Sequence, residues 1–332
     1  MCIVINNHKK PFINHKPRFF VQKYQPHYQG QRYLGNVQNQ LTTTYQRLSS
    51  GMRINSAKDD AAGLQISDRL TSQINGLNQG NRNASDGIAL AQTAEAGMDE
   101  VSGMLQKIRT LAVQASNGTN TLSDRQALAK EASSLATEIS RIATQTTYGG
   151  KTILEGQQND TSAIFSKAGN ANDVGKAGTV TLQVGSNKGD TISMQIASMV
   201  FSKIGSAAGL ADTDFADAAG TAAFVKDGNG GIKVNFTTAG SPDAIIEMMD
   251  KMIGQVDGQR ANLGAIQNRL ESSIRNQSNV AANEADARSR IRDADFAQES
   301  ANLTQQNIIQ QAASSMLMQA NTRPQLGLSL IG

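Results

Sequence analysis

Few residues in this 332-residue chain have the types and spacing that catalysis or metal binding needs. No histidine lies beyond His27, which excludes a His-Glu-x-x-His zinc site on any later helix. The single cysteine, Cys2, can form neither an intrachain disulfide nor a cysteine-based metal site. Phosphate-loop and Gly-x-Ser-x-Gly nucleophile motifs are missing, and Gly175–Val180 lacks the phosphate-loop spacing. We therefore expect no enzyme activity, no cofactor and no metal.

Two acidic clusters have residue types that could bind a cation. Asp59 and Asp60 are adjacent, and neighbouring residues of a helix point about 100° apart, so we expect them to place negative charge in the first turn of a helix. The segment 212–217, DTDFAD, lacks the later glycine and terminal glutamate of a calcium loop. Neither cluster predicts a metal site.

The composition favours long helices over a compact enzyme core. Aromatic residues make up 4% of the chain and tryptophan is absent. Nine Lys and Arg residues precede the first acid, Asp59, which leaves 22 basic and 28 acidic residues in 59–332, so we expect no nucleic-acid partner. No apolar run is long enough for a secretory signal or membrane insertion, and these signals alone predict a cytosolic protein.

Residues 1–30 differ in character from the rest of the chain. They hold three of the five prolines, all three histidines and several aromatic residues without a sustained period. We interpret them as an atypical basic and aromatic segment that is disordered or reflects a misplaced start of the sequence. Contact with RNA or an anionic membrane is the alternative to a solvated tail, which is favoured because no recognition motif frames the segment.

Helical periodicity begins in 31–58. Apolar residues recur three and four apart and predict a helix that ends near Gly51 (Leu34, Val37, Leu41, Tyr45 and Leu48). A second helix is expected from about Asp59. The polar interval 78–87 separates its start from a regular heptad (Ala91, Ala94, Met98, Val101, Leu105, Ile108 and Ala112).

A third helix is predicted after the turn at the end of this heptad. Ser123 and Gln126 have the form of a capping box at its start, and Gly149–Gly150 stops it. Alternating residues on both sides of a Gly/Asn turn then predict a β-hairpin in 179–196.

Helical spacing returns near the C-terminus. It begins at Pro242, with apolar residues seven apart (Met249, Val256, Leu263 and Leu270). A final helix is expected from about Asp293 to Asn321, stopped before Pro324.

The predicted fold is therefore mainly α. Long antiparallel helices form a terminal coiled coil and a helical core domain, and a small central insert contains the β-hairpin. We expect paired terminal helices in 31–58 and 290–332, a core domain in 59–196 and 242–289, and a short variable outer region in 197–241. Neither terminal helix has a sequence neighbour that could bury its apolar seam, so the two must pair with each other, with other copies, or with both.

The stretch from Arg47 to Gly63 is interpreted as a joint between helices. Gly51 ends the first helix, Asn55 and Ser56 offer caps, the two aspartates suit the positive end of the next helix, and Gly63 permits close approach of subunits. The candidate joint and packing residues are Arg47, Leu48, Gly51, Asn55, Asp59, Asp60 and Gly63.

Long stretches at both ends resemble bacterial flagellins. They include RLSSGMRINSAKDDAAGLQIS at 47–67, the segment 81–119, and ARSRIRDADFAQESANLTQQNIIQQAASSMLMQAN at 287–321. The resemblance covers about 31–165 and 244–332. It implies a structural subunit that is exported unfolded by the flagellar type III apparatus, without a cleaved signal peptide, and self-assembles outside the cell into the filament used for swimming. This replaces the cytosolic interpretation.

The resemblance also implies partners and positions. The partners are other copies, an export chaperone, the filament cap and hook-filament junction proteins, and the host Toll-like receptor for flagellin. Receptor-contact candidates are Lys107, Leu111 and Glu131, where Lys107 replaces the arginine of many stimulatory flagellins. Chaperone and terminal-helix candidates are Ile308, Ile309, Ala312, Met316 and Leu317.

Two alternative functions remain open. A hook-filament junction protein has related terminal helices and differs mainly in its middle. A secreted coiled-coil adhesin would need a host-binding middle domain, whereas 197–241 is short.

Overall fold

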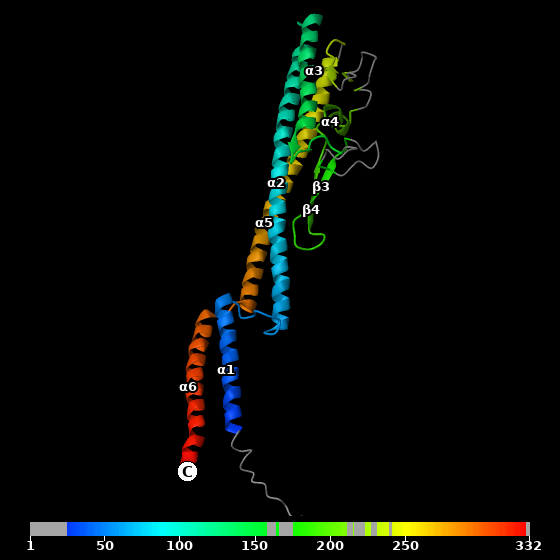
Figure 1. The fold of residues 1–332 in the computed structure, drawn as a ribbon. Helices are drawn as coiled ribbons and strands as arrows, with labels where there is room; N and C mark the ends of the chain where they lie inside the picture. The colour runs from blue at the N-terminus through cyan, green and yellow to red at the C-terminus, as the bar shows by residue number, and fades with distance from the viewer. Residues whose placement is uncertain are drawn as a thin grey trace, which may run out of the picture. The chain divides into compact units, whose positions relative to one another are not determined.

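The structure, a computed structural model, describes residues 25–157, 164–165, 175–210, 215, 223–226, 231–238 and 241–329. The chain divides into a terminal unit, within Met1–Leu70 and Asp286–Gly332, and a central unit, within Thr71–Ala285. Two long helices, α2 (Ala61–Ser116) and α5 (Ser241–Arg292), have residues in both units. The prediction of a mainly helical fold with a small β-hairpin is confirmed, and the described residues form two further two-stranded pairs (Figure 1).

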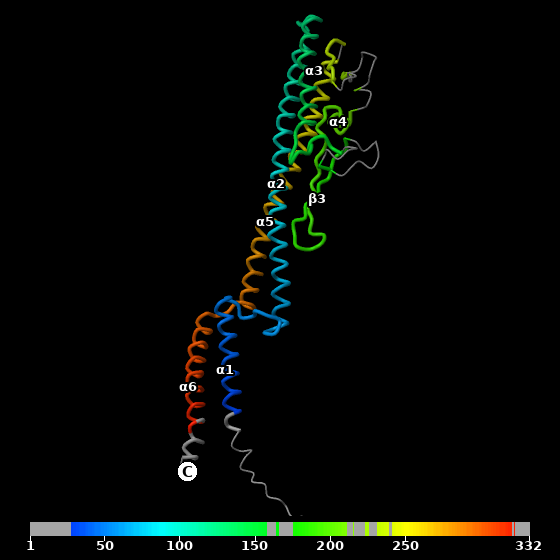
Figure 2. Tube along the Cα trace, viewed as in Figure 1, coloured from blue at the N-terminus to red at the C-terminus, as the bar shows by residue number. Residues whose placement is uncertain are grey.

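The terminal unit is built on one pair of helices. Helix α1 (Gln25–Ser50) packs along α6 (Phe296–Ser329), as the two traces in Figure 2 show. Val37 and Leu41 are buried as predicted, with 3% and 6% of their surface exposed. Tyr45 was expected on the same face, but it is 54% exposed and its neighbour Thr44 is buried instead. The Thr44 hydroxyl group, rather than the Tyr45 ring, therefore lies between the two helices.

Both ends of this helix pair extend beyond the predicted bounds. Helix α1 begins at Gln25, inside the atypical segment 1–30, whose residues 1–24 lie outside the described chain. Pro26 is compatible with this start, because backbone N–H groups in a first helical turn have no intrahelical partner. Helix α6 continues past Pro324 to Ser329, so the predicted stop was wrong; a proline removes one hydrogen bond, and here the turns on either side remain helical.

The central unit has one main apolar core, shared by α2, α3 (Leu122–Gln145) and α5. All seven predicted heptad residues of α2 are 0% exposed, which confirms their place in the core. Cross-helix pairs set the direction of α5: Arg260 Nη2 lies 2.9 Å from Asp99 Oδ1, and Arg109 Nε lies 2.5 Å from Asp250 Oδ1. Helices α2 and α5 are therefore antiparallel.

The capping box of α3 lies two residues before the predicted one. Thr121 is the N-cap, and its side chain and that of Asp124 cap the helix reciprocally. The Asp124 carboxylate accepts from the hydroxyl and the backbone N–H of Thr121, and these hydrogen bonds lower the pKa of Asp124. The Ser123 and Gln126 prediction was wrong, because a carboxylate at the third helical position serves the same role as glutamine or glutamate.

The predicted hairpin is confirmed as β3 (Gly178–Gln183) paired with β4 (Thr191–Ile196). It packs on a glycine face of α2, where a Cβ on Gly80 would clash with the carbonyl of Val184, and Asn83 Nδ2 donates to Gln183 O at 2.9 Å. The polar interval 78–87 is helical, and its glycines provide the space that the hairpin occupies.

Part of the segment 197–241 belongs to the core. Helix α4 (Phe201–Ala207) and the hairpin of β5 (Phe224–Lys226) and β6 (Ile232–Val234) lie here, while β1 (Thr147–Tyr148) and β2 (Lys151–Thr152) form a separate pair before it. The Phe201 and Phe224 rings meet edge to face with their centroids 5.2 Å apart, and both side chains are 0% exposed. The described residues of this segment thus include interior as well as surface.

We predict opposite effects for two glycine substitutions in α2. Gly80→Ala should lower the free energy of unfolding by about 1–3 kcal/mol, because the methyl group must displace the hairpin backbone. Gly103→Ala is the matched control: it has no neighbour within 4 Å of its Cβ position and should stabilise the helix by up to about 1 kcal/mol. Denaturant unfolding measures both, and a similar gain for the two variants would contradict the packing described.

Candidate assembly surfaces

Among the described residues no three His, Cys, Asp or Glu side chains gather as a metal site requires. None of the helices in the described ranges is both long and apolar enough to cross a membrane.

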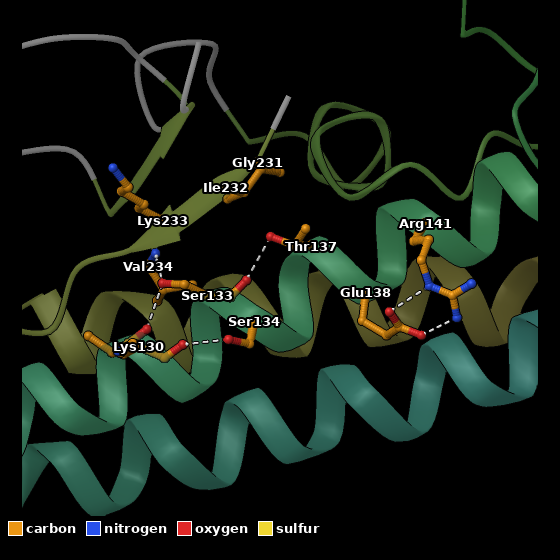
Figure 3. A pocket seen from close by; sticks show the side chains of 11 residues that line it. Lys130, Ser133, Ser134, Thr137, Glu138, Arg141, Gly231, Ile232, Lys233 and Val234 are labelled. Atoms are coloured by element: carbon orange, nitrogen blue, oxygen red, sulfur yellow. Dashed lines mark hydrogen bonds and ion pairs between the residues drawn. The ribbon is translucent and has the colours of Figure 1, made fainter. Parts of the chain in front are cut away.

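A groove of about 670 Å³ lies between α3 and β6 (Figure 3). Its central hydroxyl, Ser133, accepts from the backbone N–H of Val234 at 2.8 Å and donates to Ala129 O at 2.6 Å. Glu138 and Arg141 along the same helix pair with each other, and this contact lowers the pKa of Glu138. The serine hydroxyl is engaged with backbone atoms on both sides, so it holds the strand on the helix and does not have the geometry of an activated nucleophile.

Two polar contacts cross the pair formed by α1 and α6. Arg47 Nη1 lies 3.1 Å from Glu299 Oε1, and Thr44 Oγ1 donates to Gln306 Oε1 at 3.1 Å. The Glu299 side chain is 9% exposed, against 31% for Arg47. The second carboxylate oxygen of Glu299 and the Arg47 Nε atom are buried without a described partner. Desolvated groups of this kind are costly to misalign, so they specify which residues of the two helices face each other.

The joint connects the chain after α1 to the end of α5 and the residues that follow it. Gly51 adopts a φ of +70°, and its carbonyl accepts from the N–H of Ala294 at 3.0 Å. The backbone N–H groups of Arg53 and Ile54 donate to Arg292 O at 2.6 and 3.3 Å. Ile54 is 1% exposed, so an apolar anchor accompanies these backbone hydrogen bonds.

The aspartates of the joint have different roles from one another. Asp60 is the residue before α2, and its Oδ1 accepts from Gly63 N at 2.9 Å, as an N-cap does. Asp59 closes the preceding turn by accepting from the N–H groups of Asn55 and Ser56 at 3.1 and 2.9 Å. The expectation that Asn55 and Ser56 cap the helix was wrong, because they donate to a carboxylate instead of accepting from the helix.

Contacts within the same subunit explain why residue 63 is glycine. It is buried, and a Cβ there would lie 2.8 Å from Ile54 Cδ1 and against the Asp60 carboxylate. The close approach that requires glycine is thus made by the capping aspartate and the joint. Close approach of a second subunit at this position stays a prediction.

The three receptor-contact candidates lie in the central unit. Lys107 Nζ on α2 lies 3.3 Å from Glu131 Oε1 on α3, and their side chains are 60% and 48% exposed. Leu111 is only 7% exposed and belongs to the main core. The charged pair is available on the surface, whereas the leucine is covered by its own subunit.

The C-terminal candidates divide between two sides of α6. Ile309, Ala312, Met316 and Leu317 line an apolar groove of about 650 Å³ together with Gly30 and Tyr33 of α1. Ile308 does not line that groove and is 62% exposed. Leu48, the remaining packing candidate, is partly buried on α1.

Sequence reasoning missed Glu299 and the contact of Thr44 with Gln306. Their signal was present but weak: each is a polar residue at a position where the helical period expects an apolar one. Polar residues at buried seam positions often fix register, and searching for them would have found this set.

The fold and these surfaces define a mainly helical protein whose N- and C-terminal segments pair. Comparison with known families gives the class: the "Bacterial flagellin N-terminal helical region" matches residues 21–159, and the "Bacterial flagellin C-terminal helical region" matches 246–331. The chain is 36% identical to Flagellin B of Vibrio anguillarum and 37% identical to Flagellin B of Vibrio cholerae serotype O1, in each case over 91% of this chain and 96% of the relative. The chain therefore belongs to the bacterial flagellin family, and it is a structural subunit of the flagellar filament, which is extracellular.

A solved structure of a candidate flagellar hook-associated protein from Vibrio parahaemolyticus is also similar. It is 17% identical, with a TM-score of 0.50, and the match covers 71% of this chain and 100% of that one. Identity this low shows a shared fold alone.

We predict that removing one partner of the part-buried Arg47–Glu299 ion pair costs more stability than removing one partner of an exposed pair. Arg47→Ala should lower the free energy of unfolding by roughly 1–3 kcal/mol, because Glu299 remains buried without its partner. The control Arg290→Ala removes an exposed pair with Asp286 and should cost less than about 0.5 kcal/mol. Chemical unfolding monitored through helix content measures both variants. Equal small effects would show that the ion pair does not fix the register of the two helices.

We predict that the joint turn loosens in acid. Hydrogen bonds from Ser56 N–H, Asn55 N–H and the Ser56 hydroxyl lower the pKa of Asp59. Its stabilising contribution is then complete above the ordinary aspartate pKa and is lost as the pH falls through the lowered folded-state pKa. NMR should show the Asn55 and Ser56 amide resonances shifting in that acidic range, and Asp59→Asn should abolish the shift; titration that persists in this variant would assign it to another group.

Proposed function

We propose that this subunit leaves the cell unfolded through the flagellar type III apparatus, without a cleaved signal peptide, and self-assembles into a helical tube that drives swimming. The family membership supports this proposal. The observation that carries it is the distribution of exposed apolar side chains on the terminal helix pair. We propose no enzymatic activity beside it.

Helices α1 and α6 expose more apolar surface than a solvated helix pair requires. Their described large side chains with more than half of the surface accessible are Tyr28, Tyr33, Tyr45, Phe296, Ile308, Met316 and Met318. Helix α6 has apolar residues both in the groove toward α1 and outside it, so one partner helix leaves part of this surface in water. Exposed apolar side chains gathered on one helix pair favour a protein contact, and a second copy is the partner that the family supplies.

The same surface supports a partner before assembly. We propose that an export chaperone covers the segment with Ile308, Ile309, Ala312, Met316 and Leu317 until secretion, and that other copies cover it afterwards. The filament cap and the hook-filament junction proteins would contact subunits at the two ends of the tube. The exposed pair of Lys107 and Glu131 supports a contact with the Toll-like receptor for flagellin, in which the buried Leu111 would act through packing beneath the pair.

We predict that Met316→Lys prevents addition of the subunit to filament seeds. Met316 is 72% exposed, so lysine is tolerated in the free subunit but places a charge in an apolar contact between copies. Ser315→Lys is the matched control, because it adds the same charge at the neighbouring exposed position outside the α1 groove. Electron microscopy measures filament length after seeding, and circular dichroism verifies that helix content is unchanged.

Normal elongation by Met316→Lys would overturn the role of this surface. Failure of the unaltered chain to elongate seeds of its own filaments would overturn self-assembly itself and favour the junction-protein and adhesin alternatives.

A further inference from the structure

We propose that Asn117 is a site of spontaneous deamidation in the folded subunit. The reaction is intramolecular: the backbone nitrogen of Gly118 attacks the side-chain amide carbon of Asn117, a C–N bond forms, and the amide nitrogen leaves as ammonia together with the proton lost by the attacking nitrogen. The product is a cyclic succinimide. Water opens this ring at either carbonyl and yields aspartate or isoaspartate, so the net change replaces an NH₂ group by OH without oxidation or reduction.

The sequence requirement is met at two places in the described chain. Asn75–Gly76 and Asn117–Gly118 both join asparagine to glycine. Glycine has no side chain, so its backbone nitrogen is less hindered in attacking the asparagine amide than that of any other residue. Both asparagines are exposed. Composition and exposure therefore do not distinguish the two pairs, and any difference must come from the backbone.

The backbone protects Asn75 and leaves Asn117 reactive. Gly76 lies within α2, where its N–H is held by the intrahelical hydrogen-bond pattern and its dihedral angles are fixed. Asn117 and Gly118 come after the last residue of α2, Ser116, and both are exposed. Within the described chain the Gly118 N–H makes no hydrogen bond, and no atom lies within 4 Å of its Cβ position. The attacking nitrogen is thus unengaged and the peptide has room to rotate.

The modified residue would weaken the turn between α2 and α3. The backbone of Asn117 donates to Gln114 O and accepts from Asn120 N–H, each at 3.2 Å. Isoaspartate inserts a methylene group into the main chain and breaks this spacing. Both products also add a carboxylate at the negative end of the α2 dipole, next to the hydrogen bond from Ser116 to Asp243.

The test compares the two Asn–Gly pairs in the same full-length chain. Purified subunit is incubated near neutral pH, folded or unfolded in guanidinium chloride, and peptide mass spectrometry follows deamidation at both asparagines, with isoaspartyl methyltransferase labelling of the product. In the folded chain we expect reaction at Asn117 to be about tenfold faster than at Asn75 or more, because reaction at Asn75 needs local opening of the helix. In the unfolded chain the two rates should converge.

Two variants complete the test. Gly118→Ala should slow the reaction at position 117 while leaving the fold intact, since the site is open and Gly118 does not need a positive φ. Asn117→Gln should abolish the isoaspartate label in the peptide that contains residue 117. Equal rates at the two asparagines in the folded chain, or an Asn117 that stays intact while Asn75 reacts, would overturn the proposal.

Discussion

The terminal unit depends on backbone hydrogen bonds that join two distant parts of the chain. The residues after α1 pair with the last residue of α5 and with the residues between α5 and α6: Arg292 O accepts from Arg53 N–H, and Gly51 O accepts from Ala294 N–H. Arg53 Nη2 adds a hydrogen bond to Ile291 O, across 238 positions of sequence. Closing a loop of this length costs entropy, but the cost grows slowly with loop length. The loop is closed only once, when the joint forms. The contacts along α1 and α6 that lie beyond the joint can then form at little further loop cost.

The helix pair beyond the joint is specified more by polar groups than by apolar burial. Val37 and Leu41 are the fully buried apolar side chains that α1 contributes within its described residues, and the seam is completed by Thr44 and by the pair of Arg47 with Glu299. A buried ion pair adds little net stability compared with apolar packing, but an incorrect register would leave its charges unpaired. The central unit differs, because its helices and hairpins share a continuous apolar core with many side chains at 0% exposure.

The sequence could predict features that repeat, and it failed at features formed by single contacts. The α2 heptad and the β3–β4 hairpin were found because each residue repeats the signal of its neighbours. Helix α2 continues through the interval 78–87 although glycine is a weak helix former, and the position of Val184 explains the glycine at residue 80. The core aromatics Phe201 and Phe224 come from a segment without period, since helix α4 and strand β5 are short and contribute few buried positions each.

At the assembly surfaces, too, the sequence predicted some features and missed others. Sequence reasoning placed the terminal helices from the spacing of their apolar residues and the joint from its glycines and aspartates. It misassigned the caps, because Asp60 rather than Asn55 or Ser56 caps α2. The Asp59 carboxylate accepts from the N–H groups of both Asn55 and Ser56, and the residue types alone do not predict these hydrogen bonds. It also could not see that Leu111 is covered, because burial on the second face of α2 depends on packing that the heptad alone does not describe.

Sparse burial in the terminal unit has a consequence for assembly. A helix pair with few buried apolar residues is marginal alone, since most helical stability in proteins comes from tertiary packing. A second copy that binds only the paired form adds stability that rises with the logarithm of its concentration relative to the dissociation constant. Exposed methionines such as Met316 and Met318 suit this role, because their flexible side chains adapt to more than one neighbour. A second copy that covered this surface would therefore couple the ordering of the terminal helices to contact between subunits.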